Sequence, residues 1–416
     1  MSKETLHDYC FVEAQEYELK KHKSIPKDII DQYCELKNDK LKFNLCGFLV
    51  YKNDILIIFP KNFKISLNEF ELVNQVQTLA QTLIRYNNEK NLQSNELLGD
   101  IDSHNEEGIA SALWLIHDYI EYGFIRKDSK KYSDSGANID WQRTMKTTQP
   151  IISSSNVLYL NPYYLKNKSD TENFIVNLHK YAIQKSMLKF AWILGYKFEE
   201  YDPIFVELPC EKTLAVYLLE KELNFTFSDR EMKLINNLIE FIQGSHANSH
   251  KITIDTMATK YFHTVWEAMC KFVFKDQSNS LKSILPRPVW YLENGKTKET
   301  QQIPDILVHQ KLENNFYILD AKYYNSPKTL PGWQDLVKQF YYFYSLPQRF
   351  NKVYNILLFP GQVEKKIEIL GYIEMHNREE LGRIFAYTLD VYSLMNDYSN
   401  YNYNNWQSLL ISEIDR

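Results

Sequence analysis

Residues 301–328 read QQIPDILVHQKLENNFYILDAKYYNSPK, and this stretch decides how the C-terminal half of the chain folds. Asp305 opens an apolar run, DILVHQ, and a polar turn at 311–315 leads into a second run, FYILDAKYY. Two apolar runs joined by a short polar turn predict a β-hairpin. Side chains alternate along a strand, so Asp320 and Lys322 should share one face, and the hairpin should bring Asp305 beside Asp320.

These three side chains are the set that hydrolysis of a phosphodiester needs. Asp305 and Asp320 offer the carboxylate oxygens that Mg²⁺ prefers, Mn²⁺ can substitute for it, and the carbonyl of Ala321 is a further ligand. A bound metal polarises the phosphate and lowers the pKa of a water ligand. Lys322 would orient or deprotonate that water and neutralise charge on the pentavalent phosphate. The alternative interpretation is a surface hairpin carrying an ion pair.

The bare D/E-x-K spacing is not specific, since it recurs elsewhere in the chain, for example at Glu18 and Lys20. Only the Asp320 instance combines the spacing with an upstream Pro-Asp, a hairpin and an apolar strand. Two predicted helices flank it, one at about 256–275 containing Glu267 and one containing Gln339. These two side chains are candidates for contacting metal-bound water or the DNA backbone, although an exposed Glu and an ordinary helix-surface Gln are the alternatives.

The rest of the pattern predicts two domains. Residues 1–168 contain apolar runs of strand type around 41–63 and two amphipathic helical stretches, which indicates a β-rich and helical N-terminal domain. Residues 128–140 are polar and predict a loop. In residues 169–416, long helical stretches precede strands that alternate with a helix, which indicates an α/β layer and an α+β chain overall.

Composition limits the functional classes. The net charge is −5, whereas a protein that wraps DNA unaided usually carries a basic balance or stripe, so contacts to double-stranded DNA should be local, assisted by metal or shared with a partner. The five cysteines are far apart and form no CxxC pair, which favours a reducing compartment and excludes a structural zinc site of that type. The absence of a signal region and of a long apolar span predicts a cytoplasmic protein without membrane contact.

Glu267 on a helix, Asp305 after proline, Asp320-Ala321-Lys322 and then Gln339 on the next helix together resemble the core of the PD-(D/E)xK nuclease superfamily. That core implies a mixed sheet flanked by helices. The wider layout is similar to the McrC and LlaJI families of restriction subunits, in GFLVYKNDILIIFPK from Gly47 and IDWQRTM from Ile139.

This resemblance implies a Mg²⁺-dependent DNA endonuclease subunit that works with an AAA+ GTPase or ATPase motor of the McrB type. Residues 1–168 would then dock on the motor, and residues 169–416 would be the nuclease with a helical insertion. The chain has no G-x-x-x-x-G-K-[ST] stretch of its own, which fits this division of labour. Arg143 and Lys146 are candidates for reaching a partner's nucleotide, because an arginine supplied in trans can stabilise phosphoryl transfer; a solvated basic loop is the alternative.

Two other functions stay open at this stage: a docking protein that activates the motor without cutting DNA, and a standalone nuclease of repair or transposition. One PD-(D/E)xK site cuts one strand, so a double-strand break predicts pairing of nuclease domains.

Overall fold

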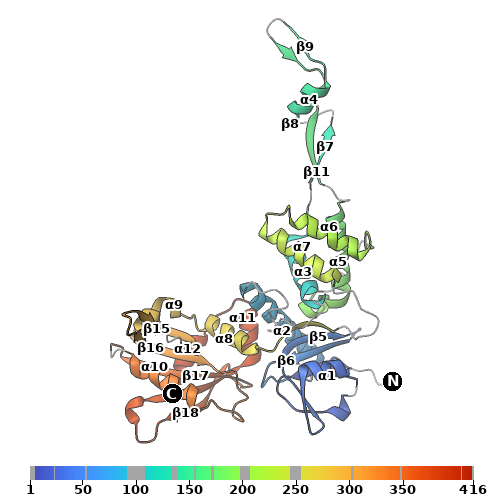
Figure 1. The fold of residues 1–416 in the computed structure, drawn as a ribbon. Helices are drawn as coiled ribbons and strands as arrows, with labels where there is room; N and C mark the ends of the chain where they lie inside the picture. The colour runs from blue at the N-terminus through green and yellow to red at the C-terminus, as the bar shows by residue number, and fades with distance from the viewer. Residues whose placement is uncertain are drawn as a thin grey trace. The chain divides into compact units, whose positions relative to one another are not determined.

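The computed structural model describes residues 5–22, 24–51, 54–90, 108–126, 128–133, 138–153, 156–169, 173–196, 207–243, 254–300, 304–346, 349–403 and 405–414. The chain divides into two compact units (Figure 1). Unit 1 comprises residues 1–110, 192–196 and 247–416, and unit 2 comprises residues 111–191 and 197–246. The predicted boundary at 168/169 falls inside unit 2, so the two proposed functional halves do not coincide with the compact units.

Unit 1 contains a four-stranded sheet that joins N-terminal strands to a strand at residues 254–259. Its strand order is β1 (Cys10–Val12), β6 (Asp54–Phe59), β5 (Cys46–Tyr51) and β12 (Ile254–Thr259). The β5/β6 pair is the antiparallel hairpin that the apolar runs predict. Beside it, β2 (Tyr17–Glu18), β4 (Lys40–Phe43) and β3 (Cys34–Lys37) form a small sheet, and α1 (Lys27–Tyr33) packs against β3. A buried core that includes Phe11, Phe43 and Leu49 holds these elements together.

The strand β12 corrects the prediction of a helix beginning at about 256. Residues 254–259 pair antiparallel with β5, and the helix α8 starts later and spans Phe262–Val273. The close approach of β12 explains why residue 47 is a glycine, because a Cβ there would lie 2.3 Å from the carbonyl oxygen of Met257. β5 and β12 are about 200 residues apart in the sequence, so local periodicity does not indicate their pairing.

The second large sheet of unit 1 is mixed, in the order β15, β16, β17, β19 and β18. The outer pairs β15/β16 and β18/β19 are antiparallel, and the inner pairs β16/β17 and β17/β19 are parallel. The bounds are β15 (Ile306–Gln310), β16 (Asn315–Ala321), β17 (Lys352–Gly361), β18 (Ile367–Glu374) and β19 (Arg383–Asp390). This is the expected α/β core with a mixed sheet flanked by helices.

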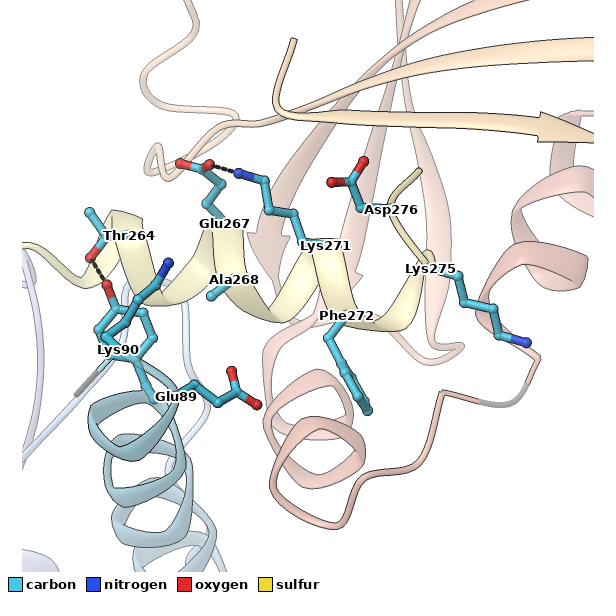
Figure 2. A pocket seen from close by; sticks show the side chains of 10 residues that line it. Glu89, Lys90, Thr264, Glu267, Ala268, Lys271, Phe272, Lys275 and Asp276 are labelled. Atoms are coloured by element: carbon cyan, nitrogen blue, oxygen red, sulfur yellow. Dashed lines mark hydrogen bonds and ion pairs between the residues drawn. The ribbon is translucent and has the colours of Figure 1, made fainter. Parts of the chain in front are cut away.

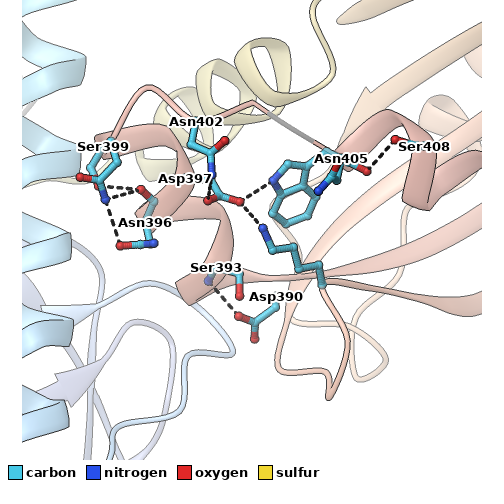
Figure 3. Close-up of polar contacts among 11 residues, drawn as sticks. Asp390, Ser393, Asn396, Asp397, Ser399, Asn402, Asn405 and Ser408 are labelled. Carbon is cyan, nitrogen blue, oxygen red and sulfur yellow. Dashed lines mark hydrogen bonds and ion pairs between the residues drawn. The ribbon is translucent and has the colours of Figure 1, made fainter.

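The helices around this sheet are amphipathic and bury one face each. The helix α10 (Trp333–Ser345) packs on β17 through a cluster of Phe340, Leu357 and Phe359, and α8 contacts β16. The remaining elements of unit 1 after α8 are α9 (Ser278–Leu281), β13 (Val289–Tyr291), β14 (Thr297–Glu299), α11 (Val391–Ser399) and α12 (Trp406–Ile414). Figure 3 shows the polar network that joins α11 to α12, in which buried Asp397 accepts hydrogen bonds from Trp406 Nε1 (2.8 Å) and Asn402 Nδ2 (2.9 Å) and pairs with Lys366.

The long helix α2 (Glu69–Lys90) comes from the N-terminal part but packs on α11 and α8 of the C-terminal part. Buried Arg85 carries this contact, since its guanidinium carbon lies 4.0 Å from the ring centroid of Phe272, 4.0 Å from that of Tyr398 and 3.7 Å from that of Tyr401. Cation–π contacts of a desolvated arginine stabilise by about 2 kcal/mol or more. The N-terminal sheet and the mixed sheet therefore belong to one folding unit.

Unit 2 contains helices and an arm of short strands. The helices are α3 (Gly108–Tyr122), which begins in unit 1, and α5 (Phe174–Phe190), α6 (Lys212–Leu223) and α7 (Asp229–Gln243). The arm contains β7 (Asp128–Ser133), β8 (Asn138–Ile139), α4 (Trp141–Thr147), β9 (Ile151–Ile152), β10 (Val157–Leu158) and β11 (Tyr164–Ser169) (Figure 1). β11 pairs antiparallel with β7 and β8. The prediction of a loop over 128–140 was therefore wrong for β7, because long-range pairing, and not the polar local composition, decides that segment.

No helix in the described ranges is long and apolar enough to cross a membrane.

Candidate active site

The hairpin of β15 and β16 places the predicted carboxylates together. The register pairs Ile306 with Leu319, so Asp305 and Asp320 are the next positions along the two strands. Asp305 Oδ2 accepts a hydrogen bond of 2.9 Å from the backbone N–H of Ala321. This bond uses the N–H of Ala321 and holds Asp305 at the end of β16.

Lys322 lies in the same site, as the alternation along the strand predicts. Its ammonium is 2.6 Å from Asp320 Oδ2 and donates a 3.1 Å hydrogen bond to Asp335 Oδ1, and its backbone N–H donates to the carbonyl of Leu358. Burial lowers the pKa of Lys322, but the two carboxylates outweigh burial and raise that pKa above its usual value. Lys322 therefore stays a cation near neutral pH in this arrangement.

Asp305 carries the opposite electrostatic signature. Burial raises its pKa, and the neighbouring carboxylates of Asp320 and Glu267 raise it further, to about 7. Crowded carboxylates repel one another when all are ionised, and a nearby positive charge reduces this repulsion. A divalent cation would relieve this repulsion, and such perturbed pKa values are concentrated at functional sites.

The donor set fits a hard cation that keeps its own waters. Within the described part of the chain, no three His, Cys, Asp or Glu side chains lie close enough together to hold a metal ion by themselves. Asp305, Asp320 and the carbonyl of Ala321 would supply two carboxylates and one main-chain oxygen. Mg²⁺ is typically held by one or two carboxylates with water in the other positions, so these residues fit that ion, with Mn²⁺ as its substitute.

The helix α8 brings Glu267 to the edge of this site. Glu267 is close enough to contribute to the raised pKa of Asp305. It forms an i,i+4 ion pair with Lys271, and Asp305 also attracts Lys271 electrostatically. Lys271 is thus a second cation at the site that sequence reasoning missed, although its position four residues after Glu267 on a helix was a usable signal.

The helix α10 contributes a second pair of residues on one face. Asp335, which sequence reasoning also missed, accepts hydrogen bonds from Lys322 and from the hydroxyl of Tyr324. Gln339 lies one turn further along and is 1% exposed. Among the described residues, neither atom of its side-chain amide has a hydrogen-bond partner. A buried amide left in this way calls for a water or a ligand, because such groups are almost always hydrogen-bonded.

The four-stranded sheet reaches the candidate site through Tyr323, the residue after Lys322. The Tyr323 hydroxyl donates a 2.6 Å hydrogen bond to Glu13 Oε2 and accepts one of 2.8 Å from the N–H of Lys61. Asn62 Nδ2 donates to the carbonyls of Tyr324 (3.4 Å) and Pro360 (3.0 Å). The backbone just beyond Lys322 is therefore held by the loop that follows β6.

Arg143 and Lys146 are not part of this cluster, since they belong to α4 in the arm of unit 2. Both are exposed. The N-cap Asp140 accepts a 3.0 Å hydrogen bond from the backbone N–H of Arg143, and the Arg143 guanidinium lies 5.0 Å from the ring centroid of Tyr163. The alternative of a solvated basic loop is wrong about the backbone, because both residues lie on the short helix α4 with exposed side chains.

The sequence matches the family model of the LlaJI restriction endonuclease over residues 45–391. It is also 30% identical over 340 residues to the type II restriction enzyme BsuMI component YdjA of Bacillus subtilis (strain 168), with 77% of this chain and 73% of that protein covered. A solved assembly of Thermococcus gammatolerans McrB AAA+ hexamers with bound McrC contains a similar chain, with a TM-score of 0.43 and 13% identity over 94% of this chain and 98% of that one. By the extent of the family match and of the B. subtilis match, the chain belongs to the LlaJI restriction endonuclease family.

Proposed function

We propose that the chain is the Mg²⁺-dependent DNA endonuclease subunit of a multi-component restriction system, which hydrolyses phosphodiester bonds of double-stranded DNA together with an AAA+ NTPase partner. The observation that carries this proposal is the convergence of Asp305, Asp320 and Lys322 at the end of β16. Membership of a restriction endonuclease family supports it. The component named in the B. subtilis relative supports a system of several subunits.

The residues divide the chemistry as follows. Asp305, Asp320 and the Ala321 carbonyl would hold the metal, which when bound would polarise the scissile phosphate and acidify a water. Lys322, kept cationic by Asp320 and Asp335, orients the attacking water and stabilises the charge that develops on the phosphate. Glu267 at the edge of the site and the buried amide of Gln339 would contact metal-bound water or the DNA backbone.

The arm of unit 2 is the proposed contact with the motor. It carries Arg143 and Lys146 together with exposed apolar side chains, among them Ile152 (74% exposed), Leu160 (65%) and Trp141 (54%). Apolar side chains gathered on a solvent-exposed element mark interaction sites. An AAA+ motor of the McrB type is the proposed occupant, because the chain has no P-loop of its own and a nucleotide bound to a partner would attract the two cations.

Pairing of two nuclease domains on DNA is part of the same proposal. One site of this kind cuts one strand, so a double-strand break needs two copies or two events. Clean double-strand cutting by a proven monomer in one encounter would contradict the pairing but not the nuclease.

The test is plasmid cleavage in Mg²⁺ or Mn²⁺ by the wild type, Lys322→Ala and the control Lys20→Ala, each with and without the motor subunit and its nucleotide. Lys20 has the same D/E-x-K spacing but is exposed on a different element. The expected result is cleavage by wild type and Lys20→Ala and a loss of about 10²–10³-fold in Lys322→Ala, in line with removal of one transition-state-stabilising group.

Cleavage that persists in a folded Lys322→Ala would overturn the assignment of the site. Full nucleotide hydrolysis by the complex without any DNA cleavage would favour a docking subunit. Cleavage that needs no motor would favour a standalone nuclease.

A further inference from the structure

A cavity of about 710 Å³ lies along the side of α8 that faces away from the mixed sheet (Figure 2). Its walls come from the end of α2, from α8 and from the two residues Lys275 and Asp276 just beyond it. Glu267, a rim residue of the candidate active site, is also a wall residue of this cavity. The cavity and the candidate active site therefore share Glu267 as a neighbour.

The acidic groups in the walls already have partners. Glu89 accepts a 2.6 Å hydrogen bond from Arg85 Nε and another of 2.6 Å from the Tyr398 hydroxyl. Asp276 Oδ1 accepts the backbone N–H of Leu307 at 3.0 Å. Glu89 thus joins α2 to α11, and Asp276 joins the end of α8 to β15.

Three lysines, Lys90, Lys271 and Lys275, also line the cavity. The Lys275 ammonium lies 4.5 Å from the ring centroid of Tyr403. For Lys90, no ion pair is found within the described ranges. Lys271 pairs with Glu267, and its side chain is 39% exposed, so it can turn towards another anion. A lysine ammonium on a flexible stem binds phosphate as a point charge.

We infer that this cavity binds the sugar–phosphate backbone of the DNA strand being cut, next to the scissile phosphate, through Lys90, Lys271 and Lys275. Lys271 exchanges Glu267 for a DNA phosphate when the strand enters. The inference rests on the proposed function, since it adds a substrate path to that same site. A backbone path is favoured over base reading because the cations are lysines, which contribute charge and carry no base-specific geometry.

The test measures DNA binding without cleavage, in Ca²⁺ and separately in EDTA, with a duplex oligonucleotide at several salt concentrations. The variants are Lys271→Met and Lys275→Met, each compared with Lys271→Arg, which keeps the charge, and with the remote exposed control Lys20→Met. Each loss of a phosphate contact should lower the slope of log K against log salt by about 0.7–0.9. We expect that drop and a several-fold weaker affinity at 0.1 M salt in both methionine variants, and wild-type slopes in Lys271→Arg and Lys20→Met.

Unchanged slopes in Lys271→Met and Lys275→Met, with melting temperatures near that of the wild type, would overturn the inference. So would a wild-type chain that shows no salt-dependent DNA binding at 50 mM salt. The nuclease proposal fails separately: if the methionine variants show the lower slopes but the wild type never cleaves DNA, the cavity remains a DNA site and the catalytic assignment is removed. If the wild type cleaves DNA while the slopes of the methionine variants stay unchanged, the catalytic assignment stands and the cavity is not a DNA site.

Discussion

Tyr323→Phe removes one oxygen from the buried contact between the two sheets of unit 1. The wild-type hydroxyl donates to Glu13 Oε2 and accepts from the N–H of Lys61, and the residues Tyr323 and Glu13 are 8% and 7% exposed. The variant leaves two buried polar groups without this partner. An unsatisfied buried group costs about 1–3 kcal/mol, so the free energy of unfolding should fall by about 2–5 kcal/mol.

The loss should depend on pH with a defined sign. Burial raises the pKa of Glu13 above its ordinary value of 4.5, while the charge of Lys61 and the Tyr323 hydrogen bond lower it. An acid with a raised folded-state pKa stabilises the fold below its unfolded pKa and loses that contribution as pH rises through the folded value. Without the hydroxyl the folded pKa of Glu13 rises further, so the deficit of Tyr323→Phe should be larger at pH 8 than at pH 5.

Denaturant unfolding at pH 5, 6.5 and 8 measures both quantities. Tyr341→Phe is the matched control, because Tyr341 is 49% exposed and exposed substitutions usually change stability by less than about 0.5 kcal/mol. A deficit below about 0.5 kcal/mol at every pH, or one that shrinks as pH rises, would refute the reasoning.

Three further outcomes are expected. Burial lowers the pKa of His179 to about 3, below its usual 6.5. The neutral ring therefore contributes its full stability to unit 2 above pH 6.5, and the free energy of unfolding should fall by about 2 kcal/mol by pH 5. Thermal melts at pH 5 and 8 should show this loss in the wild type and not in His179→Gln. Asp397→Asn should lower the free energy of unfolding by about 2–4 kcal/mol, because Lys366 loses its partner (Figure 3). In a double-mutant cycle, the double variant Lys366→Met/Asp397→Asn should regain part of this lost stability. A fragment of residues 247–416 should lack a cooperative thermal transition by circular dichroism, because β12 pairs with β5; a sharp transition would contradict the single folding unit.

The central hairpin and the placement of its charged side chains could be predicted from the sequence because every relation there is local. Asp305 and Asp320 are 15 residues apart and joined by one turn, and the two-residue period of a strand places Lys322 on the face of Asp320. The helical period likewise placed Glu267 within a helix, although that helix begins at Phe262 and not at about 256.

The supporting residues could not be predicted, because their partners are remote in sequence. Nothing near Glu13 indicates that its carboxylate accepts from Tyr323, 310 residues away. Asp335 was within reach of sequence reasoning, since it lies one turn before Gln339 on a helix, but its pairing with Lys322 depends on how α10 packs against the sheet. Tertiary packing decides such contacts, and local pattern does not record it.

The contacts around Tyr323 couple the candidate site to the N-terminal sheet. Lys322 is bonded to β17 by its own N–H, and the next two residues are held by Lys61 and Asn62 from the loop after β6. Shifting that loop must therefore either carry the end of β16 with it or break buried hydrogen bonds. Coupling of this kind is reciprocal in free energy. A change at the site that stabilises the end of β16 stabilises the β6 loop equally, and a partner that rearranged the N-terminal sheet would change the geometry of Lys322 without contacting it.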